Sequence, residues 1–316
     1  MPRVLPCRRV VLQALATACL AATGGVQAQP QAATEAPLPA VRHGRIERWA
    51  NVPSRHVDAR HVDVWLPDGY TPDKRYAVLY MHDGQMLFDA RTTWNQQAWN
   101  VQDALTRLRA AGRIRDVIVV GVWNNGKWRH SEYLPQAFLP GLPADFREAL
   151  VRDGLQGKPQ SDAYLRFLVE ELKPAIDARY ATRPDRDNTF IMGSSMGGLI
   201  SVYAMNRHPE VFGGAAGLST HWVGIFKPNA ALPLAAFNYL RQHLADPATH
   251  RLYQDHGTTE LDAIYAPYQS LVNSLASERG YVDGHNLLAL TFEGTGHNET
   301  AWAQRLEVPL TFLLRP

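Results

Sequence analysis

Hydrophobic residues along the chain fall into two alternating patterns, short apolar runs and longer segments with helical spacing. The segments 76–84 and 116–123 are nearly continuous apolar runs, which are typical of strands buried on both faces. The pattern also predicts strands within 61–70, 188–193, 212–220, 250–257 and 286–294. It predicts helices within 161–180, 198–210, 230–244 and 268–278, and a further helix at the end of the chain.

The regular alternation of strand and helix predicts the fold class. Because parallel neighbours need a crossover connection, we expect an α/β protein with a mostly parallel central sheet and helices on both faces. Such sheets place their chemistry at the carboxyl ends of the strands. A linker rich in Pro and Ala at 29–41 precedes the pattern, so residues 42–316 are expected to form a single domain. The segment 123–161 has no clear period and is a candidate loop over the site.

Residues 1–28 have the three parts of an export signal. Arg3, Arg8 and Arg9 precede an apolar run, and small residues follow near Ala28. The run is too short and too rich in small residues for a membrane span of about 20 residues. We therefore expect an exported protein, periplasmic or secreted, without a stable membrane span. The paired arginines permit a twin-arginine route as well as general secretion.

Charge and cysteine content exclude several classes of protein. The chain has 32 basic and 30 acidic residues, and without the leader 29 basic residues remain against 30 acidic ones. This balance gives no electrostatic reason to expect a nucleic-acid partner. Cys7 and Cys19 both lie in the leader, which excludes a cysteine nucleophile and a cysteine-based metal site elsewhere. No H-E-x-x-H spacing is present, and we expect neither a metal nor a cofactor.

The stretch "TFIMGSSMGGLISVY" carries the clearest chemical signal. Its "GSSMG" matches G-x-S-x-G with Ser195 at the centre, between a predicted strand and a predicted helix. An abrupt turn from strand to helix strains the corner residue and requires neighbours without bulk. The serine oxygen would stand at a helix N-terminus, where free amides favour developing negative charge. We therefore predict that Ser195 is a nucleophile, while the alternative is an ordinary glycine-rich turn.

A serine nucleophile needs a base and a carboxylate that orients the base. His297, in "FEGTGHNETAW", follows the last predicted strand and should reach the same edge of the sheet as Ser195. The carboxylate is expected in "RLYQDHGTTELDAIY", after the preceding strand. Asp255 lies within that strand, which leaves Glu260 and Asp262, and the pattern does not choose between them.

Several stretches together resemble the esterase family of α/β-hydrolases that includes esterase D, feruloyl and acetylxylan esterases, the trilactone siderophore esterases and antigen 85. The resemblance covers nearly all of the chain after the leader. It rests on "VLYMHDGQMLFD", "VVGVWNNGKWRHSEYLPQ", the long stretch around "GSSMG", "YQDHGTTELDAIY" and "EGTGHNETAW".

The resemblance implies an α/β-hydrolase fold and a set of roles. The nucleophile falls on Ser195, the histidine on His297 and the oxyanion-binding amides on Met196 and Gln85. The acid falls in the loop after "DHG", whose length varies in the family; Asp262 and Glu260 both stay open, with Asp262 preferred.

Aromatic residues follow several predicted strands and are candidates for substrate contact. Trp94 and Trp99 could stack on a sugar or an aromatic acyl group, although they could equally pin long loops to the body. His221 and Trp222 occupy a place that the family often turns toward its substrate. Arg129 and Glu132 are expected to form an ion pair that holds a loop.

These observations predict an exported serine esterase that acts on a small-molecule or carbohydrate ester. One alternative is that the same residues transfer the acyl group to an alcohol, as the resemblance to antigen 85 would imply. A second alternative is a protein that binds glycans on this scaffold without turnover. The residues do not identify the acyl group.

Overall fold

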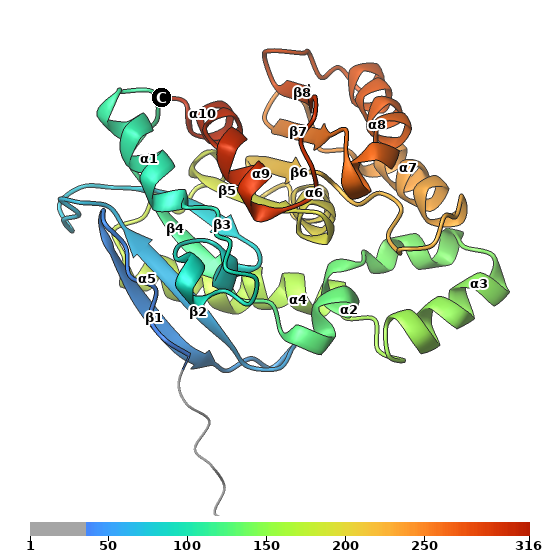
Figure 1. Ribbon diagram of the computed structural model, residues 1–316, viewed down its shortest axis with the longest axis horizontal. Coiled ribbons are helices and arrows are strands. Elements are labelled where there is room, and N and C mark those ends of the chain that lie inside the picture. Colours follow the sequence, from blue (N-terminus) through green and yellow to red (C-terminus); the bar gives the residue numbers. More distant parts are fainter. Residues whose placement is uncertain (1–35) are drawn as a thin grey trace, which may run out of the picture. The chain divides into compact units, whose positions relative to one another are not determined.

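The computed structural model describes residues 36–316, and the predicted export signal at 1–28 lies outside the described residues, as does most of the predicted linker. Residues 37–316 form one compact unit. It is built on an eight-stranded sheet with the order β1-β2-β4-β3-β5-β6-β7-β8 (Figure 1). The strands are β1 Arg45–Val52, β2 Arg60–Leu66, β3 Ala77–Met81, β4 Val117–Val122, β5 Thr189–Ser194, β6 Gly214–Leu218, β7 Arg251–Gly257 and β8 Leu287–Phe292.

Strand direction divides the sheet into two parts. β1 pairs with β2 and β2 with β4 in antiparallel register, whereas every pairing from β4 through β3 to β8 is parallel. The strands β3 to β8 therefore share one carboxyl edge and one amino edge. This confirms the predicted α/β class with its mostly parallel sheet.

Helices cover both faces of the sheet. They are α1 Val101–Ala110, α2 Arg129–Tyr133, α3 Ala144–Ala149, α4 Ser161–Arg166, α5 Lys173–Arg179, α6 Met196–Arg207, α7 Ala231–His243, α8 Ala266–Glu278, α9 Glu299–Arg305 and α10 Glu307–Leu314.

The alternating side chains of the strands explain the two layers of helices. Val78 and Tyr80 of β3 belong to an apolar cluster that includes residues of α4, α6, α7 and α8. Ala77 and Leu79, which alternate with these two along β3, belong to a second cluster on the other face, with residues of α1, α9 and α10. Burial of these two clusters fixes the sheet between its helices and holds the loops at both edges.

Two regions differ from the sequence prediction. The segment 123–161 is not one long loop, because it contains α2, α3 and short 3₁₀ and π turns. The predicted helix at 161–180 is interrupted by a π-helical stretch at Phe167–Leu172, between α4 and α5.

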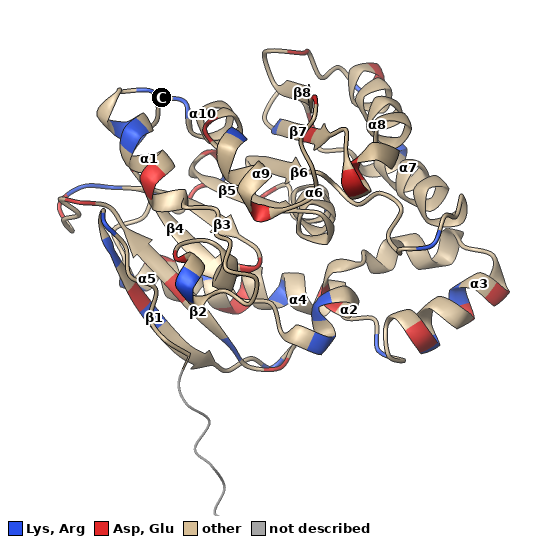
Figure 2. Cartoon of the chain, viewed as in Figure 1, with Lys and Arg blue, Asp and Glu red and all other residues tan. Residues whose placement is uncertain are grey.

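Basic and acidic positions are interspersed along the outer elements, as on α3, and neither sign takes over a whole helix (Figure 2). No helix within residues 36–316 is both long and apolar enough to cross a membrane.

Candidate active site

Ser195 stands at the corner between β5 and α6. β5 ends at Ser194, α6 begins at Met196, and Ser195 has the positive φ of 56° and a ψ of −124°. A non-glycine residue rarely adopts this conformation, and such strain persists only where the surrounding structure enforces it. The sharp, strained turn predicted from "GSSMG" is therefore present.

The two glycines of the motif are required by close contact. A Cβ on Gly193 would lie 2.6 Å from the carbonyl carbon of Gly197, so the strand and the first turn of the helix touch through backbone alone. A Cβ on Gly197 would lie 3.3 Å from both His82 and the carboxylate of Asp83. The spacing G-x-S-x-G thus allows the corner to pack against the loop that follows β3.

His297 and Asp262 meet at the same edge of the sheet. Nδ1 of His297 lies 2.6 Å from Oδ1 of Asp262, and this carboxylate is fully buried. His297 follows β8, whereas Asp262 lies in a short 3₁₀ turn after β7, so two neighbouring parallel strands deliver the pair. The contact fixes the imidazole and leaves Nε2 as its available nitrogen.

Glu260, the other candidate acid, does not contact the imidazole. Its Oε2 accepts a hydrogen bond of 2.7 Å from the backbone N–H of His297. Its carboxyl carbon would lie 2.5 Å from a Cβ on Gly296, so the side chain packs directly on the backbone of the histidine loop. Glu260 thus holds the loop, whereas Asp262 orients the ring.

The second oxygen of Asp262 is held by groups that the sequence analysis missed. Oδ2 accepts hydrogen bonds from Ser219 Oγ at 2.5 Å and from the N–H of Gly257 at 2.6 Å. Ser219 Oγ in turn accepts from Trp302 Nε1 at 2.9 Å and from Arg305 Nη2 at 2.8 Å. A single hydroxyl therefore joins the carboxylate to two buried donors of α9.

Arg305 is neutralised by a carboxylate of its own. Its guanidinium lies 2.8 Å from Oδ1 of Asp255, and both side chains are almost completely buried. Burial raises the pKa of Asp255 despite the opposing effect of Arg305. For Asp262, burial also favours the neutral acid, but hydrogen bonds from His297, Ser219 and Gly257 outweigh it and leave the pKa below its ordinary value. Asp262 is therefore held as the anion that an imidazole partner needs.

The two backbone amides predicted to bind an oxyanion both lie in the first turn of a helix. Met196 is the first residue of α6 and Gln85 the second of a 3₁₀ turn at Gly84–Met86, so neither amide has a partner within its own helix. The side-chain oxygen of Gln85 accepts a hydrogen bond of 3.1 Å from the N–H of Asn124, which fixes the turn. The roles of these amides remain predictions.

The turn after β3 is further held by a charged pair. Arg129 binds the carboxylate of Asp83 through two hydrogen bonds of 2.7 and 2.8 Å, and Asn124 adds a third of 2.7 Å. Burial acts against ionisation of Asp83, yet Arg129 and Asn124 together lower its pKa. The predicted pair between Arg129 and Glu132 is thus wrong, because Glu132 binds the buried Arg60 at 2.6 Å instead.

A cavity of about 600 Å³ lies at the carboxyl edge of the sheet, beside the residues described above. Ser195 and His297 both line it, together with Asp83, Asn124 and Arg129. Within residues 36–316 the hydroxyl of Ser195 makes no hydrogen bond. Hydrogen bonds between a nucleophile and its base are often long in the absence of substrate. The predicted nucleophile and base thus share one pocket at the carboxyl edge.

Aromatic side chains form part of the same pocket. Two of the predicted aromatic residues line the pocket: Trp94, which is 84% exposed, and Trp99, which is buried. Trp302 and Phe226 also line it. Phe226 is 86% exposed, so two large aromatic side chains, Trp94 and Phe226, are open to solvent beside this cavity. Trp302 was missed because its position in a terminal helix gives no sign of its neighbours.

His221 and Trp222 do not take the predicted place. Both are buried, and neither lines the pocket. His221 contacts Tyr265 through a hydrogen bond of 2.6 Å, and Tyr265 packs edge-on against His297. Direct contact of Trp222 with a substrate is therefore not supported, since only 1% of its surface is exposed.

No group of three or more His, Cys, Asp or Glu residues within the described part of the chain is arranged to hold a metal ion.

Residues 55–312 match the sequence model of a family described as "Putative esterase". An endo-1,4-beta-xylanase/feruloyl esterase of Xylanibacter ruminicola is 26% identical over 283 residues, which cover 84% of this chain and 31% of that protein. The chain thus spans about a third of the length of this curated relative.

Solved structures agree in fold. A ferulic acid esterase superposes with a TM-score of 0.61 at 20% identity, covering 86% of this chain and 98% of the other. The enterobactin esterase of Shigella flexneri superposes with a TM-score of 0.60 at 17% identity, covering 89% and 61%. These likenesses confirm the predicted α/β-hydrolase fold.

Proposed function

The chain belongs to the esterase family whose sequence model spans residues 55–312, and from this premise we propose that it hydrolyses carboxylic esters through an acyl-enzyme on Ser195. His297 is the base, Asp262 orients it, and the amides of Met196 and Gln85 stabilise the oxyanion. The observation that carries the proposal is the 2.6 Å contact between His297 and a buried, ionised Asp262 beside a strained serine.

The proposed reaction has two halves. Nε2 of His297 takes the proton of Ser195 as Oγ bonds to the ester carbonyl carbon, and the carbonyl electron pair moves to the oxygen that the two amides bind. Collapse of this intermediate breaks the bond to the alcohol, which leaves with the proton from His297. Water then attacks the acyl group by the same route and releases the acid and free Ser195. The chain needs no cofactor for these steps.

The pocket favours an ester with a flat or sugar-like group. Trp94 and Phe226 expose large aromatic faces at its wall, and Trp99 and Trp302 lie deeper. The similar proteins include a feruloyl esterase and an enterobactin esterase, and one solved ferulic acid esterase is a complex with ferulic acid. We propose an aromatic or carbohydrate ester as the substrate class.

We further propose that residues 1–28 direct export and that residues 42–316 act as a single domain after the linker 29–41. A protein exported in this way would meet its substrate in the periplasm or outside the cell. The observation that supports this is the Arg-rich start and the apolar run of the leader.

Hydrolysis of a nitrophenyl ester by matched serine variants tests the proposed nucleophile. Ser195→Ala should lose at least about 10⁴-fold in kcat, since the rest of a triad retains little activity without its nucleophile. Ser194→Ala, one residue earlier at the same pocket, should keep activity within about tenfold. Full activity of Ser195→Ala would refute the proposal. With an alcohol added to the unchanged protein, formation of a new ester in place of free acid would indicate acyl transfer.

A further inference from the structure

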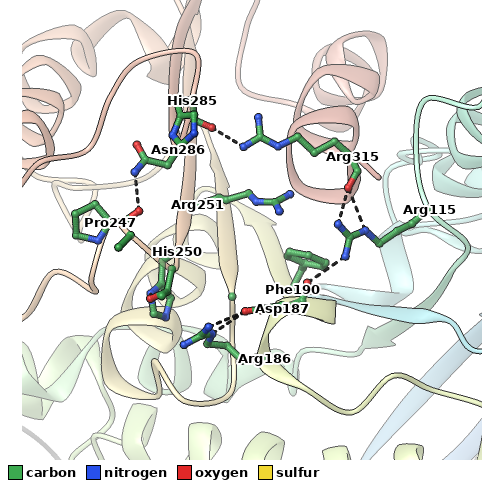
Figure 3. Close-up of a pocket in the computed structure, with 13 residues that line it drawn as sticks. Arg115, Arg186, Asp187, Phe190, Pro247, His250, Arg251, His285, Asn286 and Arg315 are labelled. Carbon is green, nitrogen blue, oxygen red and sulfur yellow. Dashed lines mark hydrogen bonds and ion pairs between the residues drawn. The ribbon is translucent and has the colours of Figure 1, made fainter.

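A second cavity lies at the amino edge of the sheet, opposite the active site. It has a volume of about 300 Å³ and lies among the segments that precede β4, β5, β6, β7 and β8 (Figure 3). Its charged lining consists of four arginines and a single aspartate, with two histidines beside them. The arginines are Arg115, Arg186, Arg251 and Arg315.

Most of this positive charge has no carboxylate partner. Arg186 pairs with Asp187 at 2.8 Å. Arg115, Arg251 and Arg315 form no ion pair with any residue of the described range 36–316. Arg115 instead donates to the carbonyl of Arg315 and to Asn188, so its guanidinium serves to hold the end of α10.

Arg251 and Arg315 keep most of their donors free. Within residues 36–316, Arg315 donates one side-chain hydrogen bond, from Nη2 to the carbonyl of His285 at 2.7 Å. Arg251 likewise donates one, from Nη1 to the carbonyl of Leu313 at 2.9 Å.

Figure 3 shows the guanidinium of Arg251 reaching into the pocket between Arg115 and Arg315. Partial burial, with Arg315 and Arg115 nearby, lowers the pKa of Arg251 to about 10, although Asp187 acts in the opposite direction. Like charges that crowd in this way are unfavourable unless an anion joins them.

We propose that this pocket binds the phosphate or sulfate group of an anionic ligand. Guanidinium groups suit such oxyanions, because their planar N–H donors match the oxygens in pairs. A dianion offsets the three unpaired charges better than one carboxylate does. The cavity holds the volume of roughly ten waters at about 30 Å³ each, which leaves room for part of an attached sugar or glycerol unit.

The ligand could be free inorganic phosphate or a phosphate ester. Calorimetric titration of the full chain at constant ionic strength distinguishes the two. Inorganic phosphate should bind saturably at one site, whereas chloride should give no saturable heat. Glycerol 3-phosphate should bind at least about threefold more tightly if the natural ligand is an ester, and equally if it is the free ion.

Substitution of Arg251 tests the location. Arg251→Gln should weaken phosphate binding at least about tenfold. The control Arg152→Gln removes a charge that is exposed and paired with Asp153, and should bind as the unchanged protein does. Equal affinity in Arg251→Gln, or phosphate that binds no better than chloride, would overturn the proposal.

A second variant covers the case in which Arg251→Gln fails to fold. Arg315→Gln keeps the bond from Arg251 to Leu313 and should still weaken phosphate binding at least about threefold. Ser195→Ala should bind phosphate normally, so that the outcome is independent of the proposed esterase activity. Unchanged affinity in Arg315→Gln together with a misfolded Arg251→Gln would count against this pocket.

Discussion

The two edges of the sheet differ in how their charged side chains are paired. At the carboxyl edge Asp83 pairs with Arg129, Asp255 with Arg305, and Asp262 with His297, so each of these three carboxylates has a partner within the protein. At the amino edge Arg251 lines a cavity and forms no ion pair within residues 36–316. The difference indicates that the carboxyl edge is preorganised from within, whereas the amino edge is completed by a ligand.

The largest expected effect separates the two acids of the carboxyl edge. Asp262→Asn should lower kcat by about 10³- to 10⁴-fold, because an amide cannot hold the imidazole in the required tautomer. Glu260→Gln should cost less than about tenfold, since the amide oxygen still accepts from the N–H of His297. Steady-state hydrolysis by both variants measures this, and equal losses would show that the distinction between ring and backbone contact has no consequence.

Removal of one arginine at each edge compares paired with unpaired charge. Arg305→Met leaves Asp255 buried without a partner, which should lower the free energy of unfolding by about 3–5 kcal/mol. Arg251→Met leaves no carboxylate without its partner and removes one of several like charges. It should raise the free energy of unfolding by up to about 1 kcal/mol in the absence of phosphate.

Urea unfolding of these two variants at pH 7 provides the measurement. A loss in Arg251→Met as large as that in Arg305→Met would contradict the contrast between the edges. Exposed Arg152→Met serves as the control, with an expected change within about 0.5 kcal/mol.

Acid should destabilise the fold through a buried histidine at the carboxyl edge. Burial lowers the pKa of His82 to about 3, so at pH 5 the unfolded chain binds a proton there that the folded protein does not. Stability therefore falls as pH drops below about 6.5, and His82 alone should contribute about 2 kcal/mol of loss by pH 5.

Comparison of unfolding at pH 7 and pH 5 tests this for the unchanged protein and His82→Asn. The variant should lose about 2 kcal/mol less between the two pH values, whatever its stability at pH 7. If both proteins lose the same amount, His82 is not held neutral in the fold.

The smallest effect concerns the hydroxyl behind the acid. Ser219→Ala removes one donor from Asp262 and should lower kcat about tenfold. The pKa of Asp262 should rise without this bond, so activity should disappear at a higher pH on the acid side. A pH–rate profile checks this, with Ser274→Ala on the exposed face of α8 as the control. A lower kcat without movement of the acid limb would assign Ser219 a merely structural role.

The sequence predicted the corner at Ser195 and the strands that carry it, because periodicity and glycine spacing are local signals. It left Glu260 and Asp262 open, since a shift of two residues in a short turn decides which carboxylate reaches the ring. Arg305 could not be predicted, because its partner Asp255 lies 50 residues earlier and only tertiary packing joins them.

The error at Arg129 and Glu132 has the same origin. The two residues lie three positions apart in a segment predicted to be a loop, and they were expected to pair with each other. The short α2 instead turns Arg129 toward Asp83 and Glu132 toward Arg60, two partners that are distant in sequence. Buried carboxylates and guanidiniums pair according to the packing around them, which local spacing does not reveal.

The most direct test of the proposed mechanism is the site of covalent labelling by a fluorophosphonate. The account predicts one adduct for each molecule, located by peptide mass spectrometry on Ser195, and much slower labelling in His297→Ala. An unlabelled Ser195, or an adduct on another residue, in a protein that still hydrolyses esters would contradict the account.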